Sequence, residues 1–356
     1  MNAKQALIKY QKRVEPLLND YFKSVKPRYK KVSPESLEAV EILEEYTLRR
    51  AKRLRAALMY YSYLMMGGKN KKAAMDASIF IEILHAYLLI HDDVMDQDVL
   101  RRGKPTAHKI YEGIHKERYG LQDPVHFGES MAINLGDVAC HISLKLLVDS
   151  DFEAENKIRA LSKLHGQITT VGLGQMLDVI GSVRNEIKEK DVFQTHEYKT
   201  ATYTYETPIA VGAILAGASD RNVKTLSKYS IPAGIAFQIQ DDILGMYGDE
   251  DKLGKANTSD LREGKHTLLI IKALEKASKK DGAAITRALG NSNLTDRMAE
   301  RVREIIRKTG SLGYSKKTAK KFVYKAKDAL EAMPDWDGEG REFLEGVADY
   351  MINREF

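Results

Sequence analysis

Two pairs of aspartates in the sequence each follow directly on an apolar run. The first is Asp92-Asp93, with a further aspartate at Asp96, and the second is Asp241-Asp242. Residues four apart share one face of a helix, so the carboxylates of Asp92 and Asp96 would point into the same space and repel each other. Such an arrangement requires a counter-cation, and hard oxygen ligands suit Mg2+. The alternative for either pair alone is an exposed helix end with solvated carboxylates.

Basic residues follow both aspartate pairs. Arg101, Arg102 and Lys104 come shortly after the first pair, and Lys255 and Lys265 come after the second. Arginine and lysine bind phosphate oxygens, whereas aspartates repel an anion unless metal ions lie between them. A diphosphate with bound Mg2+ would satisfy both kinds of residue. Salt bridges between neighbouring acids and bases are the alternative.

The elements that must position these residues are predicted to be helices. Residues 35–104 and 125–207 contain no proline, and their apolar residues recur at spacings of three and four. Because proline interrupts a helix, the prolines are expected to lie between helices. Residues 79–90 and 230–244 are apolar on nearly every side, which is typical of helices buried in a large bundle. The sequence therefore predicts an all-α protein with one domain over residues 1–356.

A polar segment, residues 246–266, interrupts this helical pattern and contains three glycines. A connection of this length is long for an idle loop, so we expect a lid over a charged ligand, with a solvated loop as the alternative. Gly254-Lys255 and Gly264-Lys265 look like parts of a phosphate-binding P-loop. However, the glycine spacing differs, and neither lysine is followed by serine or threonine. The nucleotide-binding signal is therefore weak.

The composition excludes several classes of protein. Of the 356 residues, 43% are hydrophobic and 30% are charged, which fits a globular chain and not a disordered or fibrous one. A single cysteine, Cys140, cannot form an internal disulfide, and no zinc-finger spacing occurs. No apolar stretch has the length expected of a signal peptide or a membrane span, so we expect a cytoplasmic protein without stable membrane insertion. The net charge of +6 would suit nucleic acid, acidic lipid or a phosphorylated small molecule.

Taken together, these residues resemble the motifs of the trans-isoprenyl diphosphate synthases, or polyprenyl synthetases, and in particular those of the archaeal geranylgeranyl diphosphate synthases. The resemblance runs over nearly the whole chain and rests on six segments in the same order. They read HDDVMD at 91–96, RRGKPT at 101–106, GQMLD at 174–178, KTATYT at 199–204, FQIQDDILG at 237–245 and SDLREGK at 259–265. One aspartate motif alone would be unspecific, whereas six ordered segments are very specific.

The resemblance implies the isoprenoid synthase fold, in which antiparallel helices surround a central cavity, and a homodimer. It also implies that an allylic diphosphate ionises with the help of about three Mg2+ ions per active site, because metal and cationic side chains stabilise the charge of the leaving pyrophosphate. The double bond of isopentenyl diphosphate then attacks the allylic cation, and the released pyrophosphate removes a proton. The expected product is geranylgeranyl diphosphate, with farnesyl diphosphate or a mixture as the alternative.

The same resemblance assigns roles to the motif residues. The Mg2+ ligands are expected to be Asp92, Asp96 and Asp241, supported by Asp93, Gln175, Asp178, Asp242 and Asp260. The allylic diphosphate is expected to contact Arg101, Lys199, Lys255 and Lys265. Isopentenyl diphosphate is expected at Lys52, Arg55, His85 and Arg102. The residues expected to stabilise the allylic cation, and thus to be catalytic, are Lys199, Thr200 and Gln238.

The floor of the product tunnel is expected one helical turn before the first aspartate motif. Tyr87 stands five residues before Asp92, and Leu88 stands four before it. The bulky Tyr87 predicts a short product, while the smaller Leu88 leaves more depth; an ordinary core aromatic is the alternative for Tyr87. His85 and Asp92 are seven residues apart, so a helix places both on one face. For His85 alone, a core histidine is the alternative.

Two segments depart from the family pattern. The basic motif normally opens with two glycines and closes with a proline, but here it reads RAKRLRA at 50–56, which affects the loop of the isopentenyl site. The second aspartate motif ends in Gly245 instead of an aspartate, so its first aspartate, Asp241, is expected to suffice.

Three other functions are possible from the residues. A class I terpene cyclase would share the fold and the first motif, but its second metal site typically carries Asn, Ser and Glu ligands. A regulatory subunit of a heteromeric synthase usually loses one aspartate motif, and both motifs are present here. A basic helical nucleic-acid-binding protein would explain the net charge, but the lysines are dispersed and an aspartate-lined cavity would oppose phosphate binding. We therefore expect no nucleic-acid partner.

Overall fold

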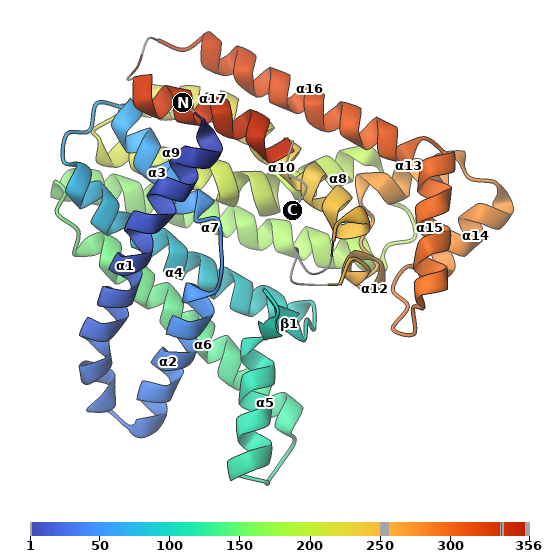
Figure 1. The fold of residues 1–356 in the computed structure, drawn as a ribbon, viewed down its shortest axis with the longest axis horizontal. Coiled ribbons are helices and arrows are strands. Elements are labelled where there is room, and N and C mark those ends of the chain that lie inside the picture. Colours follow the sequence, from blue (N-terminus) through green and yellow to red (C-terminus); the bar gives the residue numbers. More distant parts are fainter. Residues whose placement is uncertain (1, 250–255, 335, 337, 353–356) are drawn as a thin grey trace.

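The computed structural model describes residues 2–249, 256–334, 336 and 338–352, and these residues are almost entirely helical (Figure 1). The helices of the first half are α1 (Ala3–Lys30), α2 (Pro34–Leu48), α3 (Leu54–Met65), α4 (Lys71–Met95), α5 (Ala107–Arg118), α6 (Pro124–Val148) and α7 (Ala154–Val183). Two very short strands, β1 (Leu100–Arg101) and β2 (Lys104–Pro105), pair antiparallel between α4 and α5. The predicted all-α fold class is confirmed.

The second half of the chain continues this helical pattern. Its helices are α8 (Glu189–Thr195), η1 (His196–Glu206), α9 (Thr207–Leu215), α10 (Asp220–Tyr247), α12 (Ser259–Arg262), α13 (Leu268–Lys276), α14 (Lys279–Ala288), α15 (Asp296–Lys308), α16 (Ser311–Glu331) and α17 (Gly338–Ile352). The element η1 is a π-helix, a wide and rare helical form that is often found at functional sites.

Local signals explain where several helices begin. The side chain of Ser33 caps α2 and that of Asp123 caps α6, and in both cases proline follows as the first helical residue. Proline suits that position because its fixed φ is helical and its missing N–H would have no partner there. α4 begins where the side chain of Asn70 accepts a hydrogen bond from the N–H of Ala73.

The expectation that prolines lie between helices is wrong at three positions. Pro16 and Pro27 lie inside α1, and Pro232 lies inside α10. An internal proline costs a helix about 3 kcal/mol because it removes one backbone hydrogen bond and clashes with the preceding turn. Both helices continue because each buries a long apolar face in the bundle. Tertiary packing thus outweighs the local preference.

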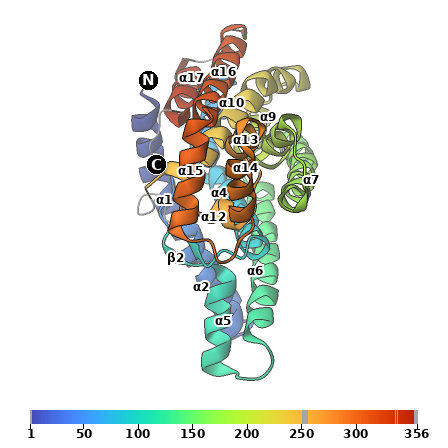
Figure 2. The same ribbon diagram turned by 90° about the vertical axis from the view of Figure 1, so that its right-hand side faces the viewer.

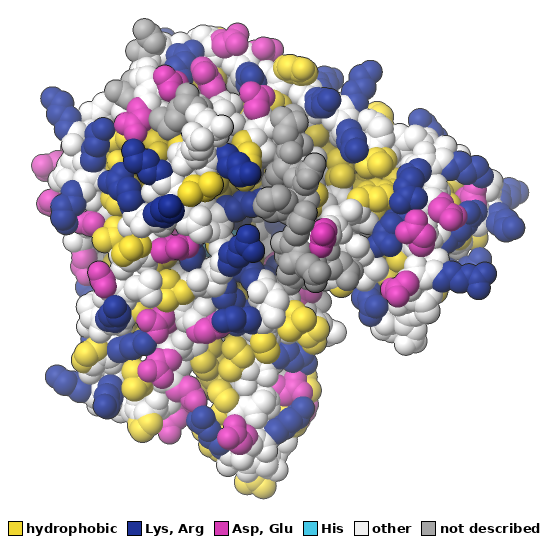
Figure 3. Space-filling model, in the orientation of Figure 1, with side chains coloured by type: hydrophobic (Ala, Val, Ile, Leu, Met, Phe, Trp, Pro, Cys, Tyr) yellow, Lys and Arg dark blue, Asp and Glu magenta, His cyan; other side chains and the backbone are white. Residues whose placement is uncertain are grey.

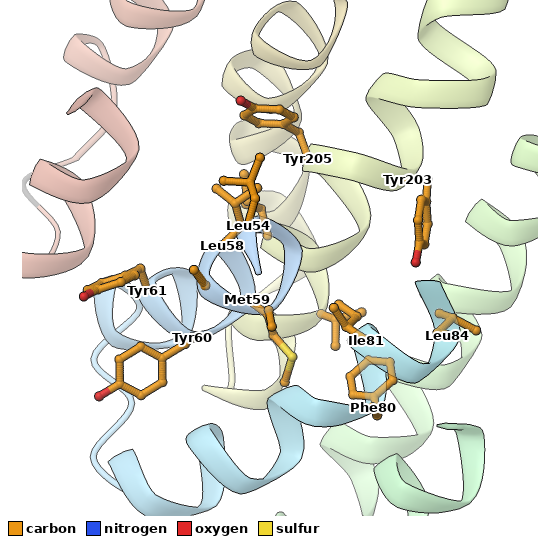
Figure 4. Close-up of a cluster of buried hydrophobic side chains, with 14 of the residues drawn as sticks. Leu54, Leu58, Met59, Tyr60, Tyr61, Phe80, Ile81, Leu84, Tyr203 and Tyr205 are labelled. Carbon is orange, nitrogen blue, oxygen red and sulfur yellow. The ribbon is translucent and has the colours of Figure 1, made fainter. Parts of the chain in front are cut away.

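The core consists of two hydrophobic clusters. Among the described residues, the larger cluster joins α1–α7, η1, α9, α10, α16 and α17, and the smaller one joins α8, η1, α10 and α12–α16. Phe322 packs against both clusters. Figure 4 shows part of the larger cluster, where side chains from α3, α4 and η1 meet. As predicted, residues 79–90 of α4 and 230–244 of α10 are largely buried.

α4 lies inside the bundle, against α1, α2, α3 and α6, whereas α6 and α7 lie at the outside, as Figure 2 shows. α4 and α6 are long and apolar enough to cross a membrane by length and composition. Most of the apolar stretch of α4 is buried within the bundle, and less than half of that of α6 is. A core helix of a soluble protein has the same properties, so these two helices are weak evidence for a membrane span.

Candidate active site

The first aspartate motif lies at the end of α4, where the partial negative charge of the helix terminus disfavours carboxylates. Asp93 is fully buried and accepts hydrogen bonds from the hydroxyl of Tyr46 (2.5 Å) and from Nε of Arg101 (2.6 Å). The side chains of Asp92 and Asp96 remain 22% and 11% exposed. The three aspartates therefore depend on cations from other elements.

Lys199 of η1 connects the end of α4 to α7. Its Nζ lies 3.3 Å from Oδ1 of Asp92 and 2.7 Å from Oδ2 of Asp178. Gln175 of α7 donates a hydrogen bond to the same Oδ1 of Asp92 over 3.0 Å. Burial raises the pKa of Asp92, but the cations around it outweigh burial and hold this pKa well below its usual range. Burial lowers the pKa of Lys199, but the neighbouring carboxylates raise it above its usual range.

Lys265, from the segment after α12, makes the corresponding contact with Asp96. Its Nζ lies 3.1 Å from Oδ2 of Asp96 and also forms an ion pair with Glu263. Burial and the nearby carboxylate of Asp92 raise the pKa of Asp96 above its usual value, although Lys265 counteracts them. Asp92 and Asp96 thus interact as like charges, as their spacing predicted.

The approach of α7 to η1 depends on Gly174. A Cβ atom at this position would lie 2.4 Å from the backbone nitrogen of Lys199 and 2.6 Å from the carbonyl carbon of Tyr198. Both of these are backbone atoms, which cannot move aside as a flexible side chain could. The glycine that opens the GQMLD segment is therefore needed to bring Gln175 and Asp178 within reach of Lys199.

The second aspartate motif, on α10, carries a chain of hydrogen bonds. The hydroxyl of Thr200 donates to Oε1 of Gln238 over 2.7 Å, and Nε2 of Gln238 donates to Oδ1 of Asp242 over 2.7 Å. On the far side, Nε2 of His196 lies 3.1 Å from Oδ2 of Asp242. These hydrogen bonds orient the Gln238 amide so that its oxygen faces Thr200 and its nitrogen faces Asp242. Asp241, the predicted ligand, is half-buried one residue before Asp242.

The second aspartate motif ends at Gly245, which lies against the side chain of Asp260. A Cβ at Gly245 would lie 2.6 Å from Oδ2 of Asp260. Asp260, from the SDLREGK segment, therefore occupies the space that a side chain at position 245 would need. The structure thus brings Asp260 close to the second motif, as the motif pattern predicted.

Two of the residues predicted for isopentenyl diphosphate, Arg55 and His85, meet between α3, α4 and η1. Arg55 donates to Nε2 of His85 over 3.2 Å and to the hydroxyl of Thr204 over 2.7 Å, and its guanidinium lies 5.0 Å from the centre of the Tyr203 ring. Burial and the positive charge of Arg55 hold the pKa of His85 well below its usual value. His85 is therefore neutral, and its Nε2 accepts the hydrogen bond.

Arg101 and Arg102 lie at the turn of the β1–β2 hairpin and point to different partners. Arg101 pairs with Asp93 and lies 2.9 Å from Asp98. Arg102 has a φ of 56°, and burial lowers the pKa of its guanidinium to about 10. A small cavity beside Arg102 is lined by Tyr46, Arg53, Glu82 and His85, among others. Lys52 is half-buried in the segment between α2 and α3.

The predicted tunnel floor lies where α4 faces α6. The ring of Tyr87 packs edge-on against the imidazole of His91, with 4.9 Å between the ring centres. That imidazole fills the space above Gly136 of α6, where a Cβ would lie 2.3 Å from it. Leu88 is partly buried and packs against the larger core cluster. Tyr87 is likewise half-buried and packs against the same cluster.

The oxygen donors of Asp92, Asp96 and Asp241 suit Mg2+, and the like-charge interaction between the first two would be relieved by a cation. Within the described residues, however, no three His, Cys, Asp or Glu side chains form a ready-made metal cluster. Asp92 and Asp96 instead contact lysines. The carboxylates fit Mg2+ by their chemistry, and to bind it Asp92 and Asp96 would replace their lysine contacts by contacts to the metal. Lys255, predicted for the allylic diphosphate, lies outside the described residues.

Sequence reasoning missed four polar residues that support the site. Arg53 and Glu82 form an ion pair of 2.9 Å with side chains only 1% and 3% exposed. A glutamate inside the apolar run 79–90 was a signal for such a buried partner, since Glu is rarely buried unpaired. His196 and Arg49 gave no comparable signal, because their roles depend on contacts across the fold.

Comparison with known proteins places this helical bundle, with aspartates on two helices and lysines and arginines facing them, among the prenyltransferases with the isoprenoid synthase fold. A sequence model of the polyprenyl synthetase family matches residues 38–308, and the chain belongs to this family. It is 34% identical over 305 residues to the geranylgeranyl diphosphate synthase of Sulfolobus acidocaldarius, covering 85% of this chain and 87% of that protein.

A second relative is named for geranylfarnesyl diphosphate instead of geranylgeranyl diphosphate. The geranylfarnesyl diphosphate synthase of Aeropyrum pernix is 33% identical over 307 residues, covering 85% of this chain and 90% of that protein. Among solved structures, the geranylgeranyl pyrophosphate synthase of Corynebacterium glutamicum, complexed with isoprenyl diphosphate and magnesium, superimposes with a TM-score of 0.91. It is 30% identical and the match covers 97% of this chain and 99% of that one.

Proposed function

We propose that this protein condenses isopentenyl diphosphate with an allylic diphosphate and releases geranylgeranyl diphosphate as its main product. The observation that carries the proposal is the pairing of Asp92 and Asp96 with Lys199 and Lys265. Residues from three segments far apart in the sequence thus meet as carboxylates and cations around one space. A diphosphate that carries divalent metal needs both kinds of charge.

Asp92, Asp96 and Asp241 would hold Mg2+, about three ions per active site, which neutralise the charge of the leaving diphosphate. Gln175, Asp178 and Asp260, with Asp93 and Asp242, would keep these ligands in place. Arg101, Lys199 and Lys265, with Lys255, would donate to the oxygens of the allylic diphosphate. Because the side chains of Arg101, Lys199 and Lys265 are largely shielded from water, their charges act on the leaving group more strongly than solvated ones would.

The second substrate would bind on the other side of α4. Arg55, Arg102 and Lys52 would bind the diphosphate of isopentenyl diphosphate, and neutral His85 orients Arg55 through its Nε2. Thr200 and Gln238 already orient each other through a 2.7 Å hydrogen bond. Together with the backbone at Lys199, their dipoles would stabilise the allylic cation while the isopentenyl double bond attacks it.

Further features support the proposed product length and a homodimer. The half-buried Tyr87 and Leu88, below the first aspartate motif, favour a product of intermediate length, consistent with a C20 chain. The exposed apolar side chains of Ile133 and Val138 on α6 and of Leu173 on α7 favour a homodimer through these helices. We further propose that the enzyme works in the cytoplasm.

The test is incubation of the purified protein with Mg2+, labelled isopentenyl diphosphate and, separately, dimethylallyl, geranyl or farnesyl diphosphate. Chromatography of the dephosphorylated products then gives the chain length. We expect a C20 alcohol from each starter. Accumulation at C15 would contradict the product assignment, and no incorporation from any starter would contradict the proposed activity.

A further inference from the structure

Arg49, the residue directly after α2, belongs to none of the motif segments, yet only 2% of its side chain is exposed. Its Nη1 donates to the carbonyl of Arg101 over 3.1 Å, and its Nη2 donates to the carbonyl of Pro105 over 2.8 Å. The same Nη2 lies 2.7 Å from the carboxylate of Glu45, one turn earlier on α2. One guanidinium therefore joins α2 to both strands of the β1–β2 hairpin.

This hairpin needs an anchor because it is too short to be stable by itself. Each strand has two residues, whereas an isolated two-stranded hairpin is marginal in water even when longer. Its turn residues, Arg102 and Gly103, both have positive φ, 56° and 75°. Such a conformation in Arg102 is uncommon for a residue with a side chain and must be held by its surroundings.

The main chain at Arg49 holds the tip of the hairpin as well. Nη1 of Arg102 donates to the carbonyl of Arg49 over 3.4 Å. The Glu45 carboxylate that pairs with Arg49 also accepts a hydrogen bond from Nζ of Lys104 over 2.7 Å. Side chain and backbone of Arg49 thus contact the hairpin on both sides of its turn.

A second route joins Arg49 to the side chain of Arg101. The guanidinium of Arg49 lies 4.6 Å from the centre of the Tyr46 ring. The hydroxyl of Tyr46 donates to Oδ2 of Asp93, whose Oδ1 accepts from Nε of Arg101. Arg49 fixes the backbone of Arg101 directly, while Tyr46 and Asp93 fix its side chain.

We propose that Arg49 is a positioning residue that sets the location of Arg101 and Arg102, and through them of both diphosphate-binding sites. The inference rests on the proposed function, because it assigns these two arginines to the two substrates. The same contacts fix the start of residues 50–53, the loop that leads into α3 and lacks the two glycines of the family pattern.

The planar guanidinium is essential to this role. Arg49 reaches three acceptors in different directions, and arginine offers five N–H donors in a fixed fork. Lysine has a single nitrogen on a flexible stem, so Arg49→Lys keeps the charge but cannot reach all three acceptors. Arg49→Gln loses the charge and most of the donors. Glu45→Gln removes the carboxylate but leaves both contacts of Arg49 to the hairpin carbonyls.

The experiment compares steady-state constants and ligand affinity in these variants. For Arg49→Gln we expect the KM values of both isopentenyl and allylic diphosphates to rise on the order of tenfold or more, because displaced arginines bind both diphosphates less well. Arg49→Lys should lie between wild type and Arg49→Gln, and Glu45→Gln should be milder. Calorimetric binding of inorganic pyrophosphate with Mg2+ should weaken in the same order, and this readout does not depend on turnover.

The matched control is Arg118→Gln, which removes an exposed arginine that pairs with Glu38 of α2, 2.8 Å away, without touching the hairpin. It should leave both KM values unchanged. A merely structural role of Arg49 would reduce the amount of folded enzyme and hence the apparent kcat, with unchanged KM and unchanged pyrophosphate affinity. That result in Arg49→Gln, or in Arg49→Lys if the former does not fold, would overturn the proposal. Absence of prenyl transfer in the wild type would contradict the proposed function, whereas the pyrophosphate titration would still decide the role of Arg49.

Discussion

The side chain of Asp92 has the most demanding environment among the predicted metal ligands. It accepts from Gln175 and contacts Lys199, and the surrounding cations keep it ionised despite burial. Removing a charge from such a set leaves the others without compensation in a region of low polarity. A substitution of Asp92 should therefore reduce activity without unfolding the protein, because α4 is held in place by its buried apolar residues.

For Asp92→Asn we therefore expect kcat to fall by about 10²- to 10³-fold, because a preorganised charge near the leaving group is lost. Circular dichroism should show unchanged helix content. Asp76→Asn is the matched control, since Asp76 lies on the same helix and pairs with the exposed Lys72. Wild-type turnover in Asp92→Asn would contradict the metal assignment.

His85 predicts a dependence of stability on pH. In the folded protein its pKa is held well below the ordinary value of about 6.5 by burial and Arg55. Below pH 6.5 the unfolded chain binds a proton at this residue that the folded chain does not. Stability is therefore lost as the pH falls from 7.5 to 5.5, by up to about 1.4 kcal/mol per pH unit from this group.

The measurement is the free energy of unfolding at several pH values for the wild type, His85→Gln and the control His165→Gln. Glutamine can accept from Arg55 but does not titrate, so His85→Gln should lose less stability than the wild type as the pH falls. His165→Gln should behave as the wild type, since His165 is exposed on α7. If the free energy of unfolding depended on pH equally in all three proteins, His85 would not contribute to the pH dependence of stability.

At the scale of elements, the site depends on how closely helices approach each other. α7 and η1 meet at Gly174, whose missing side chain leaves room for the backbone of Lys199. At Gly245 of α10 an added Cβ would meet the carboxylate of Asp260, which is a side chain and can move aside, so this approach is less strict. At Gly174 an added methyl group would press on the backbone of η1, whereas at Gly172 on the same helix it would meet no atom within 4 Å.

Gly174→Ala should therefore reduce activity strongly and cost about 1–3 kcal/mol of stability, since overpacked sites of this kind typically cost that much. Gly172→Ala is the control on the same helix, where an added Cβ meets no atom within 4 Å. It should leave activity unchanged and stabilise α7 slightly, because alanine favours the helix over glycine. The measurements are steady-state kinetics and chemical unfolding of both variants. The same loss of activity and stability in Gly172→Ala as in Gly174→Ala would contradict the explanation by close approach.

Where α4 faces α6, Tyr87 predicts the length of the product. Tyr87→Ala removes the ring that packs against His91 and should shift the product distribution beyond C20. Tyr87→Phe is the control, because it keeps the ring and loses only the hydroxyl. The products are compared by chromatography after dephosphorylation. An unchanged distribution in Tyr87→Ala would exclude Tyr87 as the floor of the tunnel.

The sequence was sufficient for the fold class, since apolar spacing indicated buried helices. It also predicted that acidic and basic motif residues meet, and Asp92 lies against Lys199 and Asp96 against Lys265. It was insufficient where an interaction joins distant segments without a local pattern. Arg49 contacts the hairpin across more than fifty residues of chain. The prolines inside α1 were misjudged for a related reason, because the packing that tolerates Pro16 is not visible locally.

At the scale of the molecule, the basic excess lies in one part of the chain. Residues 276–327, which form α14, α15 and most of α16, contain 15 Lys and Arg residues but only four Asp and Glu residues. In Figure 3 these side chains cover the right-hand part of the molecule. The rest of the chain is therefore net acidic, and the overall charge of +6 does not by itself describe the site.

The exposed apolar residues of α6 and α7 predict the state of assembly. We expect sedimentation of the wild type to give a dimer, and Val138→Lys combined with Leu173→Lys to give monomers, because buried lysines without partners are costly at an interface. Val32→Lys, between α1 and α2, replaces a residue that is equally apolar and 71% exposed. It should remain dimeric. A monomeric wild type would contradict the proposal of a dimer.

The ion pairs of Lys199 with Asp92 and of Lys265 with Asp96 have a thermodynamic consequence. A lysine in such a pair can bind diphosphate fully only after its carboxylate has bound a metal ion instead. In the same way, the carboxylate can bind metal fully only after the lysine has moved to the diphosphate. The affinities for metal and for diphosphate are therefore linked, and by reciprocity each ligand raises the affinity for the other by the same factor. With the ligand roles proposed above, metal and diphosphate would therefore bind more tightly together than either binds alone.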